Sequence, residues 1–229
     1  MAPNAIISYD DTLNDQDALA LGQVLATAGA SLTLAYVRHH TNSAAAREQL
    51  EEHEAEALLE RGSRWLGDLE VDRRVVVHAS TSEGLKALAE EQNAELVIFG
   101  SDYRTAAGHV AAQPSTQRML EGGSTAVAIA PANYRSRASH GISTVGVIST
   151  GHDRAAIETA HELADRIGAT VVERHVGVDL LVVGSRAEAP EGHVLVSSSA
   201  MNTIEESNAP VLVVAKGVPV HFASPLYVA

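Results

Sequence analysis

Three groups of residues in this sequence have the chemistry to bind a ligand or a metal ion. Asp10-Asp11 follows an apolar run and could hold a ligand, or form an acidic pair at a helix N-terminus, where the helix dipole favours negative charge. Ser197-Ser198-Ser199 precedes an expected helix over residues 200–205 and could cap it with or without a phosphate. The 11 histidines, His39-His40 among them, show no HExxH pattern and no repeated i, i+4 pairing, so we expect no metal site.

The motifs of several common enzyme classes do not occur in this sequence. It contains no GxSxG nucleophile elbow, no GxxxxGK[ST] phosphate loop and no GxGxxG dinucleotide loop. A phospho-acceptor receiver domain also begins with two acidic residues after a strand. That class needs a further aspartate after the third strand, where this chain has Val77-His78-Ala79-Ser80. We therefore expect a protein that is not an enzyme.

Composition limits the partners and the compartment. The formal charge is −13, from 29 acidic and 16 basic side chains, so we expect neither nucleic acid nor a membrane surface as a partner. Aromatic residues make up only 3% of the chain, which disfavours base stacking. There is no cysteine, and neither a signal peptide nor an apolar stretch of membrane-spanning length can be recognised. We expect a cytoplasmic protein.

The later part of the sequence repeats the earlier part. GSDYRTAAGHV, which starts at Gly100, recurs at an offset of 84 residues as GSRAEAPEGHV, which starts at Gly184. Such an ungapped match argues for duplication. The Gly-His-Val within each segment is interpreted as either a packing turn or a ligand-facing turn. The same offset places the apolar run 95–99 over 179–183, and 126–129 over 210–213.

Nearer the start of each copy the offset is 139, which places residues 6–10 over 145–149 and residues 29–31 over 168–170. The difference between the two offsets is 55 residues. The second copy therefore lacks a block equivalent to residues 39–92 and their immediate neighbours, which has the pattern of helix, strand and helix.

Apolar runs of strand length alternate with helical patterns in the first copy, which is typical of a parallel sheet. We expect two tandem doubly wound, Rossmann-like α/β units, the first five-stranded and the second truncated. In the first unit we expect strands over residues 5–9, 32–37, 75–78, 96–99 and 126–130, and helices over 17–27, 44–66, 82–92 (N-cap Ser82) and 116–121. In the second we expect strands over 144–149, 180–183 and 211–214, and a helix over 155–167.

These units give a domain division of 1–132, a polar linker over 133–142, a truncated unit over 143–217 and an apolar tail over 218–229. The tail is expected to pack across a unit or onto a second chain, because it contains Val220, Phe222, Leu226, Tyr227 and Val228. Residues 171–175 cannot repeat the placement of their counterpart, since too few residues follow for a crossover connection. An antiparallel edge or an irregular connector is expected there.

Asp10, the Gly100-Ser101 turn with its long loop, and the closing Pro-Val-Leu-Val-Val at 210–214 resemble the universal stress protein family in a tandem arrangement. The family's nucleotide pattern is G-x2-G-x9-G-[ST], in which glycines let backbone N–H groups approach phosphate oxygens. The resemblance implies ATP or AMP as ligand. It also implies that the last strands of two units pair antiparallel, here within one chain as a pseudo-dimer, with a homodimer left open.

In the first copy the family pattern begins at Gly100 and Ser101, but its second glycine falls on Tyr103 and its Gly-Ser pair on Gln113-Pro114. Tyrosine adopts positive φ only at a cost, and proline has no N–H to offer a phosphate. The resemblance also places Asp10 against the adenosine and Val37 at the end of the second strand.

In the second copy the resemblance assigns ligand contacts to Gly184, Ser185, Ala187, Ser197 and Ser198. Ala187 and Ser197 replace glycines, whereas Ser198 keeps the hydroxyl, and Ser149 stands where the family has its aspartate.

Two functions follow from these residues. The first is a stress-response regulator that binds an adenine nucleotide or a related anion weakly through the degenerate loop. The second is a structural or protein-interaction module whose pocket has decayed. Saturable nucleotide binding is predicted by the first function and not by the second.

Overall fold

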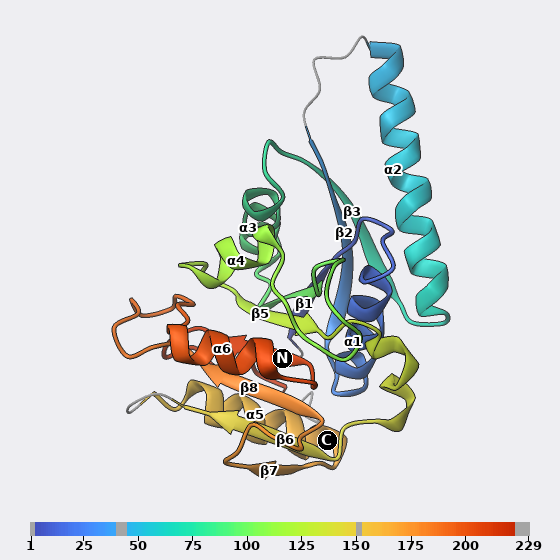
Figure 1. The fold of residues 1–229 in the computed structure, drawn as a ribbon. Coiled ribbons are helices and arrows are strands. Elements are labelled where there is room, and N and C mark those ends of the chain that lie inside the picture. The colour runs from blue at the N-terminus through green and yellow to red at the C-terminus, as the bar shows by residue number, and fades with distance from the viewer. Residues whose placement is uncertain (1–2, 40–44, 150–152, 223–229) are drawn as a thin grey trace, which may run out of the picture.

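The computed structural model describes residues 3–39, 45–149 and 153–222, which form one nine-stranded sheet in the order β3-β2-β1-β4-β5-β9-β8-β6-β7 (Figure 1). Every neighbouring pair is parallel except β5 and β9. This confirms the α/β class with a mostly parallel sheet. The strands are β1 Asn4–Ser8, β2 Ser31–Arg38, β3 Val71–Val77, β4 Leu96–Gly100, β5 Ala126–Ala130, β6 Thr144–Ile148, β7 Thr170–Val172, β8 Leu180–Gly184 and β9 Val211–Val214.

Helices cover both faces of the sheet, which explains why β4, β5, β8 and β9 are apolar throughout and fully buried. One core cluster joins α1, α2 and α5 to the sheet, and the other joins α3, α4 and α6. The helices are α1 Asp15–Thr27, α2 Ala45–Leu66, α3 Thr81–Gln92, α4 Pro114–Leu120, α5 Ala155–Ile167 and α6 Ser198–Glu206.

The two halves of the chain meet where β5 and β9 pair antiparallel, which confirms the predicted pairing within one chain. Val127 lies opposite Val213, Ala128 opposite Leu212 and Ile129 opposite Val211. At the 84-residue offset Ala128 corresponds to Leu212, so the pairing is symmetric about this central pair. The junction therefore joins equivalent strands of the two halves.

The loops after β4 and β8 form the same hydrogen bonds at this offset. The Ser101 hydroxyl donates to the Ala130 carbonyl oxygen at 2.7 Å, and the Ser185 hydroxyl donates to that of Val214 at 2.8 Å. The Gly108 N–H donates to the Ala132 carbonyl oxygen at 2.7 Å, as Gly192 does to Lys216 at 2.8 Å. Both glycines have positive φ, as the packing-turn interpretation requires.

The expected offset of 139 for the first strand is wrong by one residue. Leu96 pairs with Ala5, and its counterpart Leu180 pairs with Val145, so the structural offset there is 140. Both faces of these strands are buried, so the apolar pattern does not fix the register by inside–outside alternation. Ser149 therefore corresponds to Tyr9, and the counterpart of Asp10 lies outside the described residues.

The prediction for residues 171–175 is wrong, because the segment after α5 begins as a parallel strand and not as an antiparallel edge or an irregular connector. β7 pairs parallel with β6, and thus repeats the placement of β2 beside β1. A short return suffices because β7 has only three residues. The return crosses β6 at Gly146, where a Cβ would collide with the carbonyl oxygen of Arg174.

Several element boundaries differ from those expected. α3 begins at Thr81 with Ser80 as its N-cap, so Ser82 lies inside the helix and is buried. α1 begins at Asp15 and α4 at Pro114. β3 begins at Val71, earlier than expected. Its residues Asp72, Arg73 and Arg74 are exposed on an edge strand, so this part of the strand lacks the apolar pattern by which strands are predicted.

The segment expected as a plain linker contains the 3-10 turns η1 Tyr134–Ser136 and η2 Ala138–His140. Asp17 on α1 accepts hydrogen bonds from the Asn133 N–H, the Arg135 N–H and the Arg135 guanidinium, at 2.8 to 2.9 Å. Asp17 and Tyr134 are buried. The segment is thus part of the packed structure.

The first residues of the apolar tail pack across α5, as expected. The Val220 N–H donates to the Thr159 hydroxyl at 2.9 Å, and the Phe222 N–H donates to the Glu162 carboxylate at 3.0 Å. Val220 and Phe222 are buried. Leu226, Tyr227 and Val228 lie outside the described residues. Within the described ranges no helix has the length and apolarity needed to cross a bilayer.

Candidate ligand site at the carboxyl ends of the strands

Asp10 lies just after β1, at the carboxyl edge of the first-half sheet, and its side chain is exposed. Its backbone N–H and that of Thr12 both donate to Asp15 Oδ2 at 2.9 Å, so Asp15 fixes the loop. Desolvation by the surrounding protein raises the pKa of Asp10 to about 6 even though the side chain reaches solvent. Asp15 adds to the rise and His39 opposes it. Burial also raises the pKa of Asp15.

Asp11 differs from its neighbour because two residues hold its carboxylate, and neither of them belongs to a recognisable motif. The Tyr9 hydroxyl donates to Asp11 Oδ1 at 2.6 Å, and Arg61 on α2 donates to Oδ2 at 2.8 and 2.7 Å. These bonds hold Asp11 at a φ of +61°. The Tyr9 hydrogen bond, assisted by Arg61, lowers the pKa of Asp11, whereas burial raises that of Tyr9.

Side chains of the protein itself occupy the end of β4. The Asn14 amide donates to the carbonyl oxygens of Ser101 and Asp102 at 2.9 and 2.8 Å, and the Gln113 amide donates to that of Gly100 at 3.1 Å. A Cβ on Gly100 would collide with the Asn14 carbonyl oxygen. Glycine is therefore needed here for packing, and Ser101 is buried.

Val37 lies in the core and not in an open pocket. Its side chain is buried, and a Cβ on Gly84 of α3 would lie 3.0 Å from it. The structure thus separates Val37, which packs against α3, from the exposed carboxylate of Asp10.

Gly184 and Ser185 in the second half repeat the placement of Gly100 and Ser101. The Ser185 hydroxyl also accepts from the Leu195 N–H at 3.2 Å. Packing around Gly184 is looser, because the nearest atom to an added Cβ would be the Ala156 side chain at 3.4 Å.

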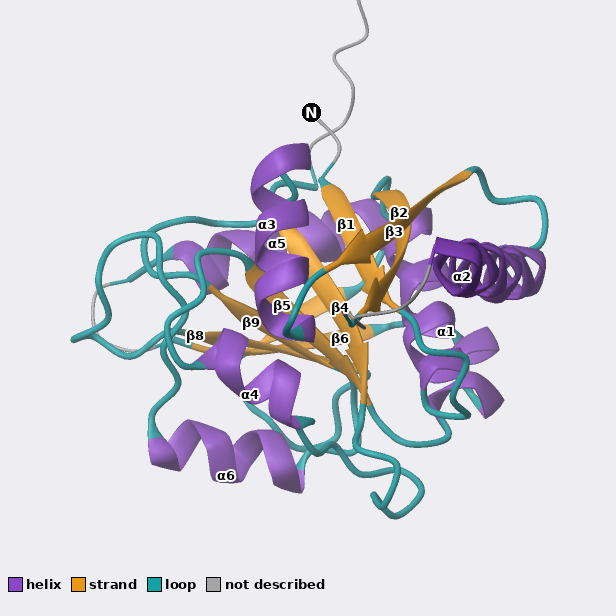
Figure 2. Ribbon diagram, turned by 90° about the horizontal axis from the view of Figure 1, so that it is seen from above, coloured by secondary structure: helices purple, strands orange, loops and turns teal. Residues whose placement is uncertain are grey.

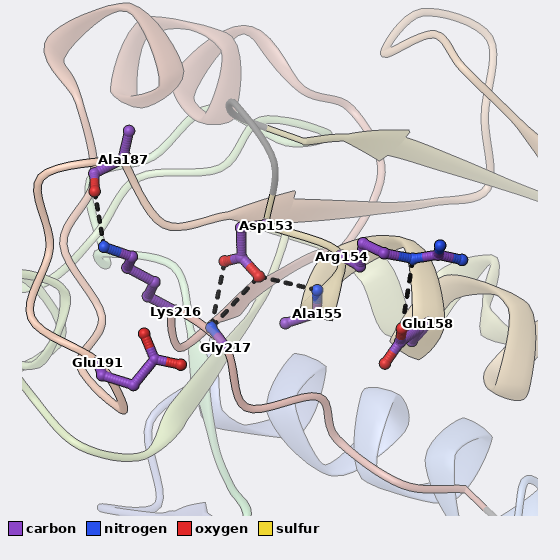
Figure 3. A pocket seen from close by; sticks show the side chains of 8 residues that line it. All are labelled: Asp153, Arg154, Ala155, Glu158, Ala187, Glu191, Lys216 and Gly217. Atoms are coloured by element: carbon purple, nitrogen blue, oxygen red, sulfur yellow. Dashed lines mark hydrogen bonds and ion pairs between the residues drawn. The ribbon is translucent and has the colours of Figure 1, made fainter.

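Ala187 lines a pocket of about 540 Å³ between the start of α5 and the loops after β8 and β9, together with Asp153, Arg154, Glu158, Glu191 and Lys216 (Figure 3). Lys216 Nζ donates to the carbonyl oxygens of Ala187 and Ala189 at 2.7 and 2.9 Å. The Asp153 carboxylate accepts from the Ala155 and Gly217 N–H groups. Figure 3 shows the bonds from Lys216 to Ala187 and from the Ala155 and Gly217 N–H groups to Asp153, which link the segments that line the pocket.

Ser197 and Ser198 lie at the start of α6, which packs on the opposite face of the sheet from α5. Ser197 Oγ accepts from the Ala200 N–H at 3.2 Å, which confirms that this residue caps the helix. Ser198 is exposed, and its hydroxyl forms no hydrogen bond with any other described residue. The structure thus places the pocket that Ala187 lines and these serines on opposite faces of the sheet.

His, Asp and Glu side chains do not converge in groups of three or more that could hold a metal ion, so far as the described residues show.

Comparison with known proteins agrees with this architecture. The model of the universal stress protein family matches residues 1–131, and the chain belongs to that family. No curated protein matches the chain.

Among solved structures, a universal stress protein from Archaeoglobus fulgidus DSM 4304 is similar, with a TM-score of 0.71 and 13% identity over 93% of this chain and 98% of that one. A putative universal stress protein from Pseudomonas aeruginosa UCBPP-PA14 has a TM-score of 0.63 and 12% identity over 94% of each chain. At such identities these similarities establish the fold alone.

Proposed function

We propose that this family member is a non-catalytic regulatory protein of the stress response that acts through protein contacts, without a nucleotide in its first half. The observation that carries the proposal is the pair of amide side chains, Asn14 and Gln113, bound to the carbonyl groups at the end of β4. In the family pattern this loop offers its backbone to phosphate.

A phosphate binds backbone N–H groups, and those of Ser101 and Asp102 already donate to the Ala130 and Ala111 carbonyl oxygens, at 3.1 and 2.9 Å. Binding of a nucleotide there would require the loop to give up these bonds. Each hydrogen bond lost without replacement costs on the order of 1 kcal/mol or more. The Ser101 hydroxyl is already engaged with Ala130, and Pro114 begins α4 without an N–H. Of the four ligand contacts predicted in the first half, only Asp10 is exposed, and a single carboxylate does not bind a phosphate chain.

A second candidate function is weak binding of ATP, AMP or a related anion in the second half. The observation that favours it is the exposed Ser198 hydroxyl at the start of α6, a helix of nine residues. A helix N-terminus and a free hydroxyl both offer donors to an anion. Solvent competes fully at such an exposed site, so we expect weak affinity.

We also propose the division into units 1–132 and 143–217, joined by 133–142 and followed by the tail 218–229, in a cytoplasmic protein. The repeated hydrogen bonds of the two loops support the presence of two equivalent units. A homodimer would need a surface other than β5 and β9, which pair with each other.

Calorimetric titration of the full chain with ATP and AMP tests these proposals. We expect no saturable heat from the first half, so Asp10→Ala should leave the titration unchanged. Saturable heat of binding that is lost in Ser198→Ala would establish the second candidate function, nucleotide binding in the second half. Saturable heat that disappears in Asp10→Ala would contradict the main proposal.

A further inference from the structure

The edge strand β3 leaves backbone groups without partners. β3 and β7 end the sheet, and β3 has seven residues against three in β7. The His78 N–H donates to the Arg38 carbonyl oxygen, which continues the ladder with β2. Successive N–H groups of a strand alternate in direction, so those of Arg73, Val75 and Val77 point away from β2. No described residue accepts a hydrogen bond from them.

A groove of about 650 Å³ lies between this edge and α2. Its walls are Glu52, His53, Glu56 and Glu60 on the helix, and Arg73 and Val75 on the strand, above Ala57 and Leu59. Figure 1 shows α2 running beside β2 and β3, and Figure 2 shows it at the β3 end of the sheet, away from β8 and β9. The groove thus lies away from the candidate site in the second half, and none of its lining residues is a predicted ligand contact.

The groove is acidic because the three glutamates recur every fourth residue along one side of α2. Glu52 and Glu56 form no ion pair with any other described residue, and Glu60 has only Arg64, at 4.0 Å. Arg73 is the one guanidinium among the lining residues. The lining therefore carries three carboxylates against one guanidinium.

Apolar contacts are available on the same face of the strand. Side chains alternate between faces, so Val71, Val75 and Val77 share the face of Arg73. Val71 and Val75 are partly buried against the core, and Val77 is 39% exposed. A strand added beside β3 would place every second side chain on the same face as these valines, next to the glutamates.

A second copy of this chain fits the edge poorly. Antiparallel pairing of two β3 strands about a two-fold axis perpendicular to the sheet would place both α2 helices on one face. The two glutamate rows would then meet, with only the two Arg73 side chains to offset them. Like charges this close repel.

We propose that the β3–α2 groove binds an extended basic segment of a partner protein, which adds to the sheet as a further strand. Backbone hydrogen bonds to Arg73, Val75 and Val77 would supply affinity, and alternate Lys or Arg side chains beside Glu52 and Glu56 would supply specificity. This partner class builds on the interaction role proposed above.

Fluorescence anisotropy with the full chain tests the proposal, using a labelled peptide of alternating lysine and valine, with a glutamate and valine peptide as the comparison. We expect saturable binding of the basic peptide alone. Glu52→Gln/Glu56→Gln should weaken binding about tenfold. Glu188→Gln/Glu205→Gln removes the same charge at exposed residues outside the groove and should leave binding unchanged.

Val75→Pro removes one outward N–H without breaking the ladder to β2, and should abolish binding while circular dichroism shows a folded chain. Equal weakening by both glutamine pairs would indicate a general charge effect and overturn the proposal, as would the absence of saturable binding to the folded wild type. Either failure would overturn only the groove proposal. The proposed function is tested separately by the nucleotide titration, which does not involve this groove.

Discussion

At the scale of single residues, the two neighbouring aspartates after β1 have opposite electrostatic situations. The Tyr9 hydrogen bond and the Arg61 ion pair lower the pKa of Asp11, whereas desolvation and Asp15 raise the pKa of Asp10 to about 6. The sequence shows two identical side chains, and the fold separates them by the Tyr9 hydroxyl and Arg61 of α2, which both bind Asp11 alone. Such asymmetry could not be predicted from residue types.

The raised pKa of Asp10 predicts a pH-dependent cost to folding. The folded protein binds a proton at this group more tightly than the unfolded chain, so its contribution to stability is most favourable below about pH 4 and falls as the pH rises through 6. Asp10→Asn should therefore raise the free energy of unfolding at pH 7.5 by about 1 kcal/mol, since solvent screens the exposed carboxylate. Urea unfolding at pH 4 should show no difference, and a variant less stable than wild type at pH 7.5 would contradict the account.

The equivalent glycines Gly100 and Gly184 should respond differently to the same substitution. Gly100→Ala forces a Cβ onto the Asn14 carbonyl oxygen and should lower the free energy of unfolding by about 1–3 kcal/mol. Gly184→Ala meets only ordinary contact and should change it by less than about 1 kcal/mol. Urea unfolding of both variants provides the comparison, and equal losses would show that the two strand ends are packed alike.

At the scale of elements, the short connection from β7 to β8 depends on a residue in a different strand. Gly146 in β6 lets the chain cross over it at Arg174, so Gly146→Val should displace the connector. Trypsin should then cleave after Arg174 faster than in the wild type, whereas cleavage after the exposed Arg186 serves as the internal reference. Unchanged relative cleavage would mean that the crossing does not need glycine.

Most elements could be predicted from the sequence because buried parallel strands are continuous apolar runs, as in β4, β5 and β8. The register of β6 could not, because a strand buried on both faces carries no alternation to fix it. The parallel pairing of β7 with β6 could not be predicted either, because a parallel strand was assumed to need a long crossover connection after it. In the candidate site, Asp10 was selected from the sequence, but Asn14 and Arg61 were not, since neither belongs to a motif.

At the scale of the whole molecule, β5 and β9 shield each other's edges, which would otherwise present unpaired backbone groups. A chain ending at residue 132 would expose β5 and should therefore self-associate at micromolar concentration, as analytical ultracentrifugation would measure. The full chain supplies the control. A folded, monomeric fragment would contradict the role assigned to this junction.

The central claim is that Asn14 and Gln113 fill the end of β4, so that the first half binds no nucleotide. Titration of the isotope-labelled chain with ATP, followed by the backbone amide resonances of Asp10, Asn14, Gly100 and Ser101 in NMR spectra, tests it residue by residue. We predict that these resonances stay in place up to millimolar ATP. Saturable shifts of the four amides would contradict the claim.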